Sequence, residues 1–256
     1  MSPKRRELPE AAALRHLFAI DQELFFLAEG KSAPPLAAPF RPVSLRRLRA
    51  IDARPRHLVF AAYTALHLAR WYADNRFCGR CGAATAHAER ERALLCPACG
   101  NSIYPRIAPA VIVAVTDGDR LLLTKYRDRP HLGWVLIAGF VEIGETLEET
   151  VQREVMEEVG LKVRNIRYYK SQPWGIASDL LAGFFCEVDG DDTIRMDPHE
   201  LKYAEWVPRK EIVLQPSDYS LTNEMMKLFR DGGWPSGEER GTAPDRRDSD
   251  QLCSAD

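Results

Sequence analysis

The sequence predicts an α/β fold for the larger, C-terminal part of the chain and two smaller modules before it. Runs rich in β-branched residues and leucine alternate there with stretches of helical periodicity. The N-terminal part carries a Pro-rich connector and two pairs of cysteines, which do not fit this alternation. With 256 residues, the chain is long enough for one large domain or two small ones with proper cores.

Residues 1–74 are predicted to form a small mixed domain. The stretch 20–30 is a candidate strand that ends at a glycine, and the Pro-rich stretch 32–42 is excluded from helices and central strands. Apolar residues recur near helical spacing over 57–77, so this segment is predicted to be an amphipathic helix.

Two C-x-x-C pairs follow this helix and predict a metal site within residues 75–104. The pairs contain Cys78, Cys81, Cys96 and Cys99, and each pair is followed by a glycine that permits a tight turn. Four thiolates in this pattern indicate one structural, tetrahedral Zn²⁺ per chain. A redox dithiol is the alternative, although no thioredoxin-like context surrounds the pairs, and a catalytic zinc is not expected without a histidine beside them.

Residues 105–231 are predicted to form the α/β domain. The segment 108–126 is expected to be a β-hairpin around an Asp-Gly turn, and strands are expected over 165–174, 180–188 and 203–209. A last helix is predicted from 221, ending at glycines, and the polar tail 232–256 is expected to be disordered.

Residues 146–159 predict a helix with an unusual cluster of acids. Thr146 and Glu149 form a capping-box pattern, and Gly160 stands where a left-handed C-cap belongs. The helix places Glu154, Glu157 and Glu158 close together, where each like-charged pair costs roughly 0.2–0.5 kcal/mol. A divalent cation would remove this repulsion, since Mg²⁺ prefers carboxylate oxygens. The alternative is a solvated acidic helix face.

Composition excludes several classes of protein. The net charge is −2, with 35 basic and 37 acidic side chains, which argues against a protein whose main affinity is for bulk nucleic acid. No apolar run reaches the 18 residues of a membrane span, so no membrane partner is expected, and the N-terminus does not resemble a secretory signal. Paired C-x-x-C thiols, with Cys186 and Cys253 left unpaired, favour the reducing cytoplasm.

The acidic helix and the loop before it resemble the Nudix box of the Nudix hydrolases. Gly139, Glu145 and the segment 153–161 match all nine defined positions of that motif. The resemblance implies an α/β/α sandwich with a mixed sheet, and catalysis with Mg²⁺ or Mn²⁺. It implies that Glu154 and Glu158 bind metal, that Glu157 is a further ligand or activates water, and that Arg153 and Glu145 orient the loop against the helix. The backbone carbonyl of Ala138 is implied as another ligand. The alternative for Arg153 is a surface side chain.

The S-Q-P-W motif at 171–174, together with the upstream cysteines, resembles the NADH pyrophosphatase branch of that family, as do the segments 103–109 and 138–148. This branch implies hydrolysis of NADH or NAD⁺ to AMP and nicotinamide mononucleotide, removal of NAD caps from RNA, and a homodimer. It implies a further metal ligand at Glu200, whose alternative is a surface carboxylate. The residues implied to contact substrate are Arg49, Tyr104, Phe140, Gln172, Pro173, Trp174, Gly175, Ile176, Ala177, Ser178, Asp179 and Thr222. Tyr104 and Phe140 would sandwich a base. The basic stretch 41–49 could contact phosphates, but a solvated helix start is the favoured interpretation.

One departure weakens the inference about the substrate. The branch often continues Pro-Phe-Pro after the tryptophan and has a serine two residues later, whereas this chain has Gly175, Ile176, Ala177 and then Asp179. Glycine raises the entropy of the free loop, and an aspartate adds negative charge beside a negative substrate. A broader pyrophosphatase acting on ADP-ribose or diadenosine compounds is therefore an alternative. A non-catalytic sensor of NAD-type ligands, docking nucleic acid through its zinc ribbon, is a second one.

Overall fold

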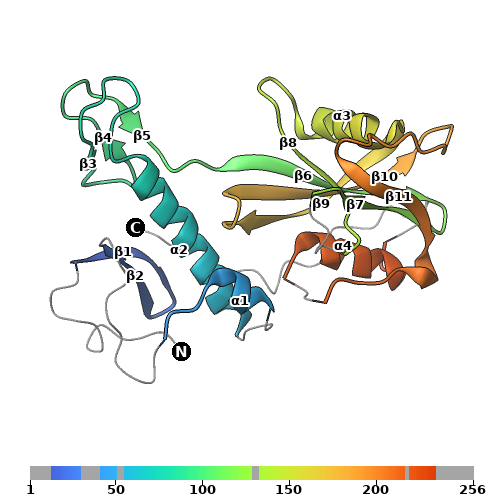
Figure 1. Cartoon of the computed structure of the whole chain (residues 1–256), viewed down its shortest axis with the longest axis horizontal. Helices are drawn as coiled ribbons and strands as arrows, with labels where there is room; N and C mark the ends of the chain where they lie inside the picture. Colours follow the sequence, from blue (N-terminus) through green and yellow to red (C-terminus); the bar gives the residue numbers. More distant parts are fainter. Residues whose placement is uncertain (1–12, 30–40, 51–54, 129–132, 217–218, 235–256) are drawn as a thin grey trace.

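The computed structural model describes residues 13–29, 41–50, 55–128, 133–216 and 219–234 (Figure 1). Its centre is a mixed six-stranded sheet with the strand order β11-β7-β6-β10-β9, in which β8 also pairs with β6. The strands are β6 (Ala108–Asp117), β7 (Arg120–Tyr126), β8 (Ile137–Phe140), β9 (Val163–Trp174), β10 (Asp179–Val188) and β11 (Leu201–Pro208). Strands β6 and β10 are parallel, and the other pairs are antiparallel.

Helices cover both faces of this sheet, so the α/β sandwich with a mixed sheet is confirmed (Figure 1). Helix α3 (Leu147–Val159) buries Val151, Val155 and Val159 against one face. Helix α4 (Leu221–Arg230) buries Met225, Met226 and Phe229 against the other. A 3₁₀ turn, η2 (Arg209–Glu211), follows β11. The two faces need separate helices because the central strands are buried on both sides.

A hairpin, two helices and the cysteine module precede the sheet. The hairpin of β1 (Ala13–Ile20) and β2 (Glu23–Glu29) and the short helix α1 (Leu45–Ala50) come first, and α2 (Arg56–Asp74) follows. The cysteine module contains β3 (Ala86–His87), β4 (Leu94–Leu95) and β5 (Ser102–Ile103). Leu68 and Trp71 of α2 pack with Leu17 of the hairpin and Leu94 of the cysteine module. Helix α2 therefore forms the core that joins these modules.

Several predicted elements differ in detail from the observed ones. The strand expected over 20–30 is β2, and its partner β1 was not predicted. The hairpin expected over 108–126 forms at its Asp-Gly turn, but only two residue pairs join β6 to β7 there. Beyond that turn β6 pairs with β10 along one edge and with β8 along the other, so the backbone of β6 is hydrogen-bonded on both sides.

The ends of the chain lie partly outside the described residues. Of the Pro-rich connector, 30–40 is not described, nor is 235–256 of the tail, which includes Cys253. The first residues of the tail are ordered, contrary to expectation, because the Trp234 ring stacks on Phe185 with centroids 4.1 Å apart. Within the described residues, no helix has the length and apolar character needed to span a membrane.

Candidate metal centres and substrate site

The sequence of α3 fixes where the helix begins and ends. The Thr146 hydroxyl accepts a hydrogen bond from the Glu149 N–H at 3.2 Å, and the Glu149 carboxylate accepts one from the Thr146 N–H at 2.8 Å. Gly160 closes the helix with a φ of 69°, in the left-handed region that favours glycine. Both ends were predicted, and both are confirmed. The register of the glutamates is set by these caps.

Arg153 ties the preceding loop to α3. Its guanidinium donates to the Glu145 carboxylate at 2.6 and 2.9 Å, and to the Phe140 carbonyl oxygen at 2.9 Å. The same guanidinium donates to Glu154 at 2.8 Å and Glu157 at 2.9 Å. Hydrogen bonding to Arg153 lowers the pKa of Glu145 to about 2, so this carboxylate stays charged at neutral pH. Arg153 therefore joins the loop, through Glu145 and the Phe140 carbonyl oxygen, to the carboxylates of Glu154 and Glu157 on α3.

Glu158 is the least expected of the three helix carboxylates. Its side chain is buried, at 1% exposure, and neither carboxylate oxygen has a hydrogen bond of good geometry. Burial, followed by the charges of Glu154 and Glu200, raises its pKa to about 8. The burial of Glu158 contradicts the alternative of a fully solvated acidic helix face. Because an unpaired buried carboxylate is costly, either a proton or a bound cation must neutralise Glu158.

The sheet approaches α3 closely at Gly139 in β8. A Cβ built on Gly139 would lie 1.9 Å from carboxyl atoms of Glu154, so a side chain at 139 would displace that carboxylate from its present position. The Glu154 side chain is 12% exposed, and burial raises its pKa. Glu157 is more open, at 60% exposure. The exposure of the three carboxylates therefore increases from Glu158 to Glu154 to Glu157.

The segment before β11 adds two more acids. Asp197 and Glu200 both raise the pKa of Glu158 through their charge, and the Asp197 N–H donates to the Glu158 backbone carbonyl oxygen at 2.8 Å. Glu200 was predicted from the motif resemblance, whereas Asp197 was missed. Its signal was the Asp-Pro-His turn, in which the Asp197 carboxylate accepts from the His199 N–H at 2.8 Å. In this oxygen-rich set Glu154 and Glu157 pair with Arg153, whereas the Glu158 oxygens have no partner, and carboxylate oxygens are the ligands of a hard divalent cation.

The four cysteines form a second centre. Their sulfur atoms all lie within 4.8 Å of one another. Among the described residues, these four side chains are the group whose ligand atoms lie close enough together to hold one metal ion. The two knuckles have the same construction: the Gly82 N–H donates to the Cys78 carbonyl oxygen, and the Gly100 N–H to the Cys96 carbonyl oxygen. Both glycines have positive φ, of 77° and 70°. Four closely spaced thiols with no open position fit a structural zinc ion.

Comparisons with known proteins agree with both centres. The family model of the NUDIX domain matches residues 106–229, and that of the NADH pyrophosphatase zinc ribbon domain matches residues 73–104. A protein of Photorhabdus laumondii named NAD-capped RNA hydrolase NudC is 39% identical over 185 residues, which cover 72% of this chain and 70% of the relative. The chain belongs to the Nudix hydrolase family. Its four-cysteine module is the zinc ribbon of that family's NADH pyrophosphatase branch.

Further relatives extend the comparison. An Enterobacter protein of the same name is 41% identical over 185 residues, covering 72% of this chain and 70% of the relative. A crystal structure of a NUDIX hydrolase from Nitrosomonas europaea superposes with a TM-score of 0.53 at 23% identity, covering 61% of this chain and 90% of that one. That structure supports the fold alone. Nudix hydrolases generally use divalent metals, and the acidic set on α3 has ligand oxygens of the kind such metals prefer.

The motif after the Nudix box lies where β9 turns into β10. The Gln172 side chain caps the start of α4, because its Oε1 accepts a hydrogen bond from the Leu221 N–H at 2.9 Å. This amide oxygen is therefore already occupied. Trp174 is half-buried, and the residues after it form a tight turn in which the Ala177 N–H donates to the Trp174 carbonyl oxygen at 3.1 Å. Ser178 completes the turn with a φ of 69°. Pro173 lies in β9 opposite Leu180, and Thr222 lies in the first turn of α4.

Asp179, which the sequence predicted to add negative charge beside the substrate, is buried. It is 8% exposed, its Oδ1 has no hydrogen-bond partner, and burial raises its pKa while the charge of His67 partly offsets this. The added negative charge is therefore held away from open solvent.

The two rings expected to sandwich a base are not brought together within one chain. Tyr104, at the end of the zinc ribbon, is 57% exposed, and its hydroxyl donates to Glu91 at 3.2 Å. Phe140, at the end of β8, is 53% exposed. Figure 1 shows the ribbon and β8 in different parts of the molecule. Arg49 lies in α1, and its side chain is outside the described part of the structure.

Proposed function

We propose that this Nudix hydrolase cleaves the pyrophosphate bond of NADH or NAD⁺ with Mg²⁺ or Mn²⁺, releasing AMP and nicotinamide mononucleotide, and that it removes NAD caps from RNA. The observation that carries the proposal is the buried, unpartnered Glu158 carboxylate beside Glu154 and Glu200. Relatives named NAD-capped RNA hydrolase, at 39% and 41% identity, support the substrate class.

The chemistry adds one water across a P–O–P linkage, so that one phosphate gains the hydroxyl and the other leaves as a phosphate. Bound divalent ions would supply charge neutralisation and lower the pKa of water. Glu154, Glu158, Glu200 and the Ala138 carbonyl would hold them. Glu157, the most open of these three helix carboxylates, would accept the proton of the attacking water or complete the ligand set. Arg153 and Glu145 position these groups through the loop that they hold.

The proposal includes a homodimer in the cytoplasm. Tyr104 and Phe140 are exposed and apart, so a base could be sandwiched between rings only if a second copy supplied one of them. Ile107, 60% exposed beside Tyr104, extends this apolar surface. The paired C-x-x-C thiols, which would bind zinc as thiolates, support a reducing compartment. Light scattering on the purified chain should give twice the monomer mass of 29.0 kDa.

Product analysis tests the function. Purified protein is incubated with NADH, NAD⁺, ADP-ribose and diadenosine compounds in parallel, with Mg²⁺ or Mn²⁺, and the products are separated by chromatography. AMP plus reduced nicotinamide mononucleotide, with NADH preferred, is the expected result. NAD-capped RNA is tested in the same way, by appearance of a 5′-monophosphate end.

The altered turn supports one alternative, a broader dinucleotide or ADP-ribose pyrophosphatase. Gly175, Ile176 and Ala177 stand where the related motif has Pro-Phe-Pro. If ADP-ribose or a diadenosine compound turned over best, the Nudix chemistry would stand and the NADH assignment would fall. Binding of NAD-type ligands without any turnover would instead favour the sensor hypothesis.

A further inference from the structure

Helix α2 packs directly behind the turn that follows Trp174. The buried Tyr63 ring meets Trp174 edge to face, with centroids 5.6 Å apart. One residue later, a Cβ built on Gly175 would lie 2.3 Å from the Tyr63 backbone carbonyl oxygen. A side chain at 175 would therefore push the turn away from the helix. Gly175 makes the free loop less rigid. In the folded protein, however, it also allows the α2 backbone to pack directly against the turn.

Two polar side chains of α2 hold the backbone on either side of this contact. Arg70 donates through Nη1 to the Ile176 carbonyl oxygen, within the turn. His67 donates through Nε2 to the Arg106 carbonyl oxygen at 2.7 Å, in the segment that leads into β6. Those segments are neighbours, because the Ala108 N–H donates to the Ser178 carbonyl oxygen at 2.9 Å. Positions 63, 67 and 70 share one face of the helix, so a single surface supports the whole turn.

The same helix also reaches the start of α4. Phe60 packs edge to face on Tyr219, with centroids 6.3 Å apart, and Val59 and Tyr63 complete a buried cluster there. Tyr219 directly precedes the N-cap Ser220 of α4, and the first N–H of α4 is bound by Gln172. Helix α2 thus touches both segments that border the proposed base-binding region, the turn and the α4 N-terminus.

We propose that Arg70 is a positioning residue for the nicotinamide end of the substrate, and that α2 supplies the stiffness that proline residues would otherwise give this turn. The inference rests on the proposed function, since it assumes that the turn after Trp174 borders the nicotinamide end of the substrate. In this arrangement the N-terminal module sets selectivity for the nicotinamide of the dinucleotide. The metal helix α3, on the opposite face of the sheet from α4, keeps the pyrophosphate chemistry.

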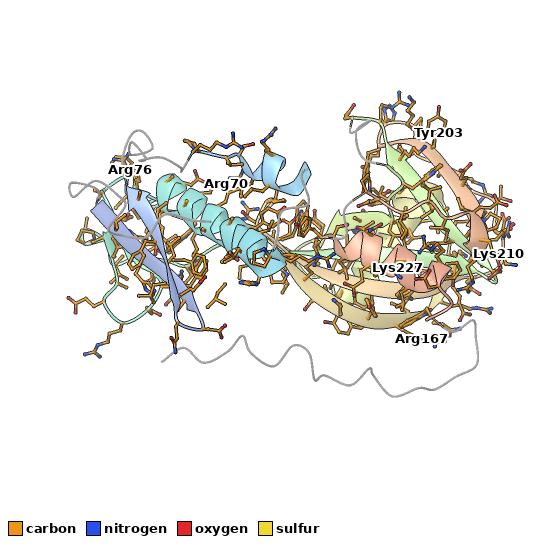
Figure 2. The ribbon with its side chains drawn as sticks, turned by 90° about the horizontal axis from the view of Figure 1, so that it is seen from below. Arg70, Arg76, Arg167, Tyr203, Lys210 and Lys227 are labelled. Carbon is orange, nitrogen blue, oxygen red and sulfur yellow. The ribbon has the colours of Figure 1, made fainter. Side chains whose placement is uncertain are left out.

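Arg70→Met tests this, with Arg76→Met as the matched control. Both arginines belong to the α2 region and are marked in Figure 2, and Arg76 is exposed with no side-chain partner among the described residues. For Arg70→Met, KM for NADH should rise roughly 10-fold, the size expected when a charged hydrogen bond is lost. KM for ADP-ribose, which has the same pyrophosphate but no nicotinamide, should change less than about twofold, as should kcat for both substrates. Arg70→Lys, which keeps a donor, should restore part of the NADH affinity.

A second measurement is independent of turnover. Hydrogen exchange at the Ala108 and Ala177 amides, whose bonds depend on the turn, should be faster in Arg70→Met than in Arg76→Met. Gly175→Ala should produce the same pattern, and Arg70→Met carries the test if that variant does not fold. Equal losses for NADH and ADP-ribose, or unchanged exchange at both amides, would overturn the proposal. If the wild type hydrolysed none of these substrates, the proposed function would fail, and the exchange comparison would still decide whether Arg70 holds the turn.

Discussion

The zinc ribbon and the acidic face of α3 are both candidate metal centres, but they are assembled in different ways. All four thiols of the ribbon come from one short segment, Cys78 to Cys99, and lie within 4.8 Å of one another. The acidic centre combines α3 with β8 and the segment 197–200, which are far apart in the sequence. Local spacing alone can specify a closed structural site. An open site, which must admit a substrate, depends on the tertiary fold and contains carboxylates that destabilise the metal-free chain.

The largest loss of activity is expected from Glu158→Gln. This variant keeps the shape of the side chain but removes the charge that binds the cation, so kcat/KM should fall on the order of 10³-fold or more. The fold should be intact by circular dichroism. Glu148→Gln, on the exposed first turn of the same helix, is the control and should stay within about twofold. Near-normal turnover by Glu158→Gln would remove Glu158 from the metal site.

The ribbon should respond in the opposite way, through stability. Cys96→Ser should lose the zinc ion, and because such a site contributes directly to folding, the ribbon should unfold and the melting temperature should fall. Zinc content and thermal unfolding are measured together, with Cys186→Ala as the control, since Cys186 is buried in the sheet away from the ribbon. Treatment with EDTA should stop turnover reversibly while the ribbon keeps its zinc. A Cys96→Ser protein with full zinc content would contradict the structural assignment.

This contrast also explains what the sequence could predict. Periodicity and caps located α2, α3, α4 and most strands, because these signals are local. The same held for the four cysteines. The pairing of β6 with β10 and β8 was not predictable, since it depends on contacts between distant segments. For the same reason the sequence missed Asp197, the burial of Glu158 and Asp179, and the contact of α2 with the turn at Gly175.

The metal-free chain should lose stability as pH rises. The pKa of Glu158 is raised from 4.5 to about 8, mainly by burial, so the folded state binds its proton more tightly than the unfolded state does. Its contribution is fully present below about pH 4.5 and is lost as pH increases through about 8, on the order of 1–3 kcal/mol in the free energy of unfolding. Urea unfolding in EDTA between pH 5 and 8.5 measures this. Glu158→Gln should flatten the slope, and identical slopes in both proteins would refute the cause.

The smallest effect should come from Asp197→Asn, and it tests whether the open site extends beyond α3. Asparagine can still accept the hydrogen bond from the His199 N–H, so the turn is kept while one negative charge near Glu158 is removed. The concentration of Mn²⁺ giving half-maximal activity should rise about three- to tenfold, with kcat at saturating metal nearly unchanged, because an outer charge affects affinity more than chemistry. Asp189→Asn, which removes an exposed charge with no effect on Glu158, is the control. An unchanged metal dependence would confine the site to the helix carboxylates and Glu200. The acidic site would then draw on fewer distant residues, and its assembly would differ less from that of the ribbon.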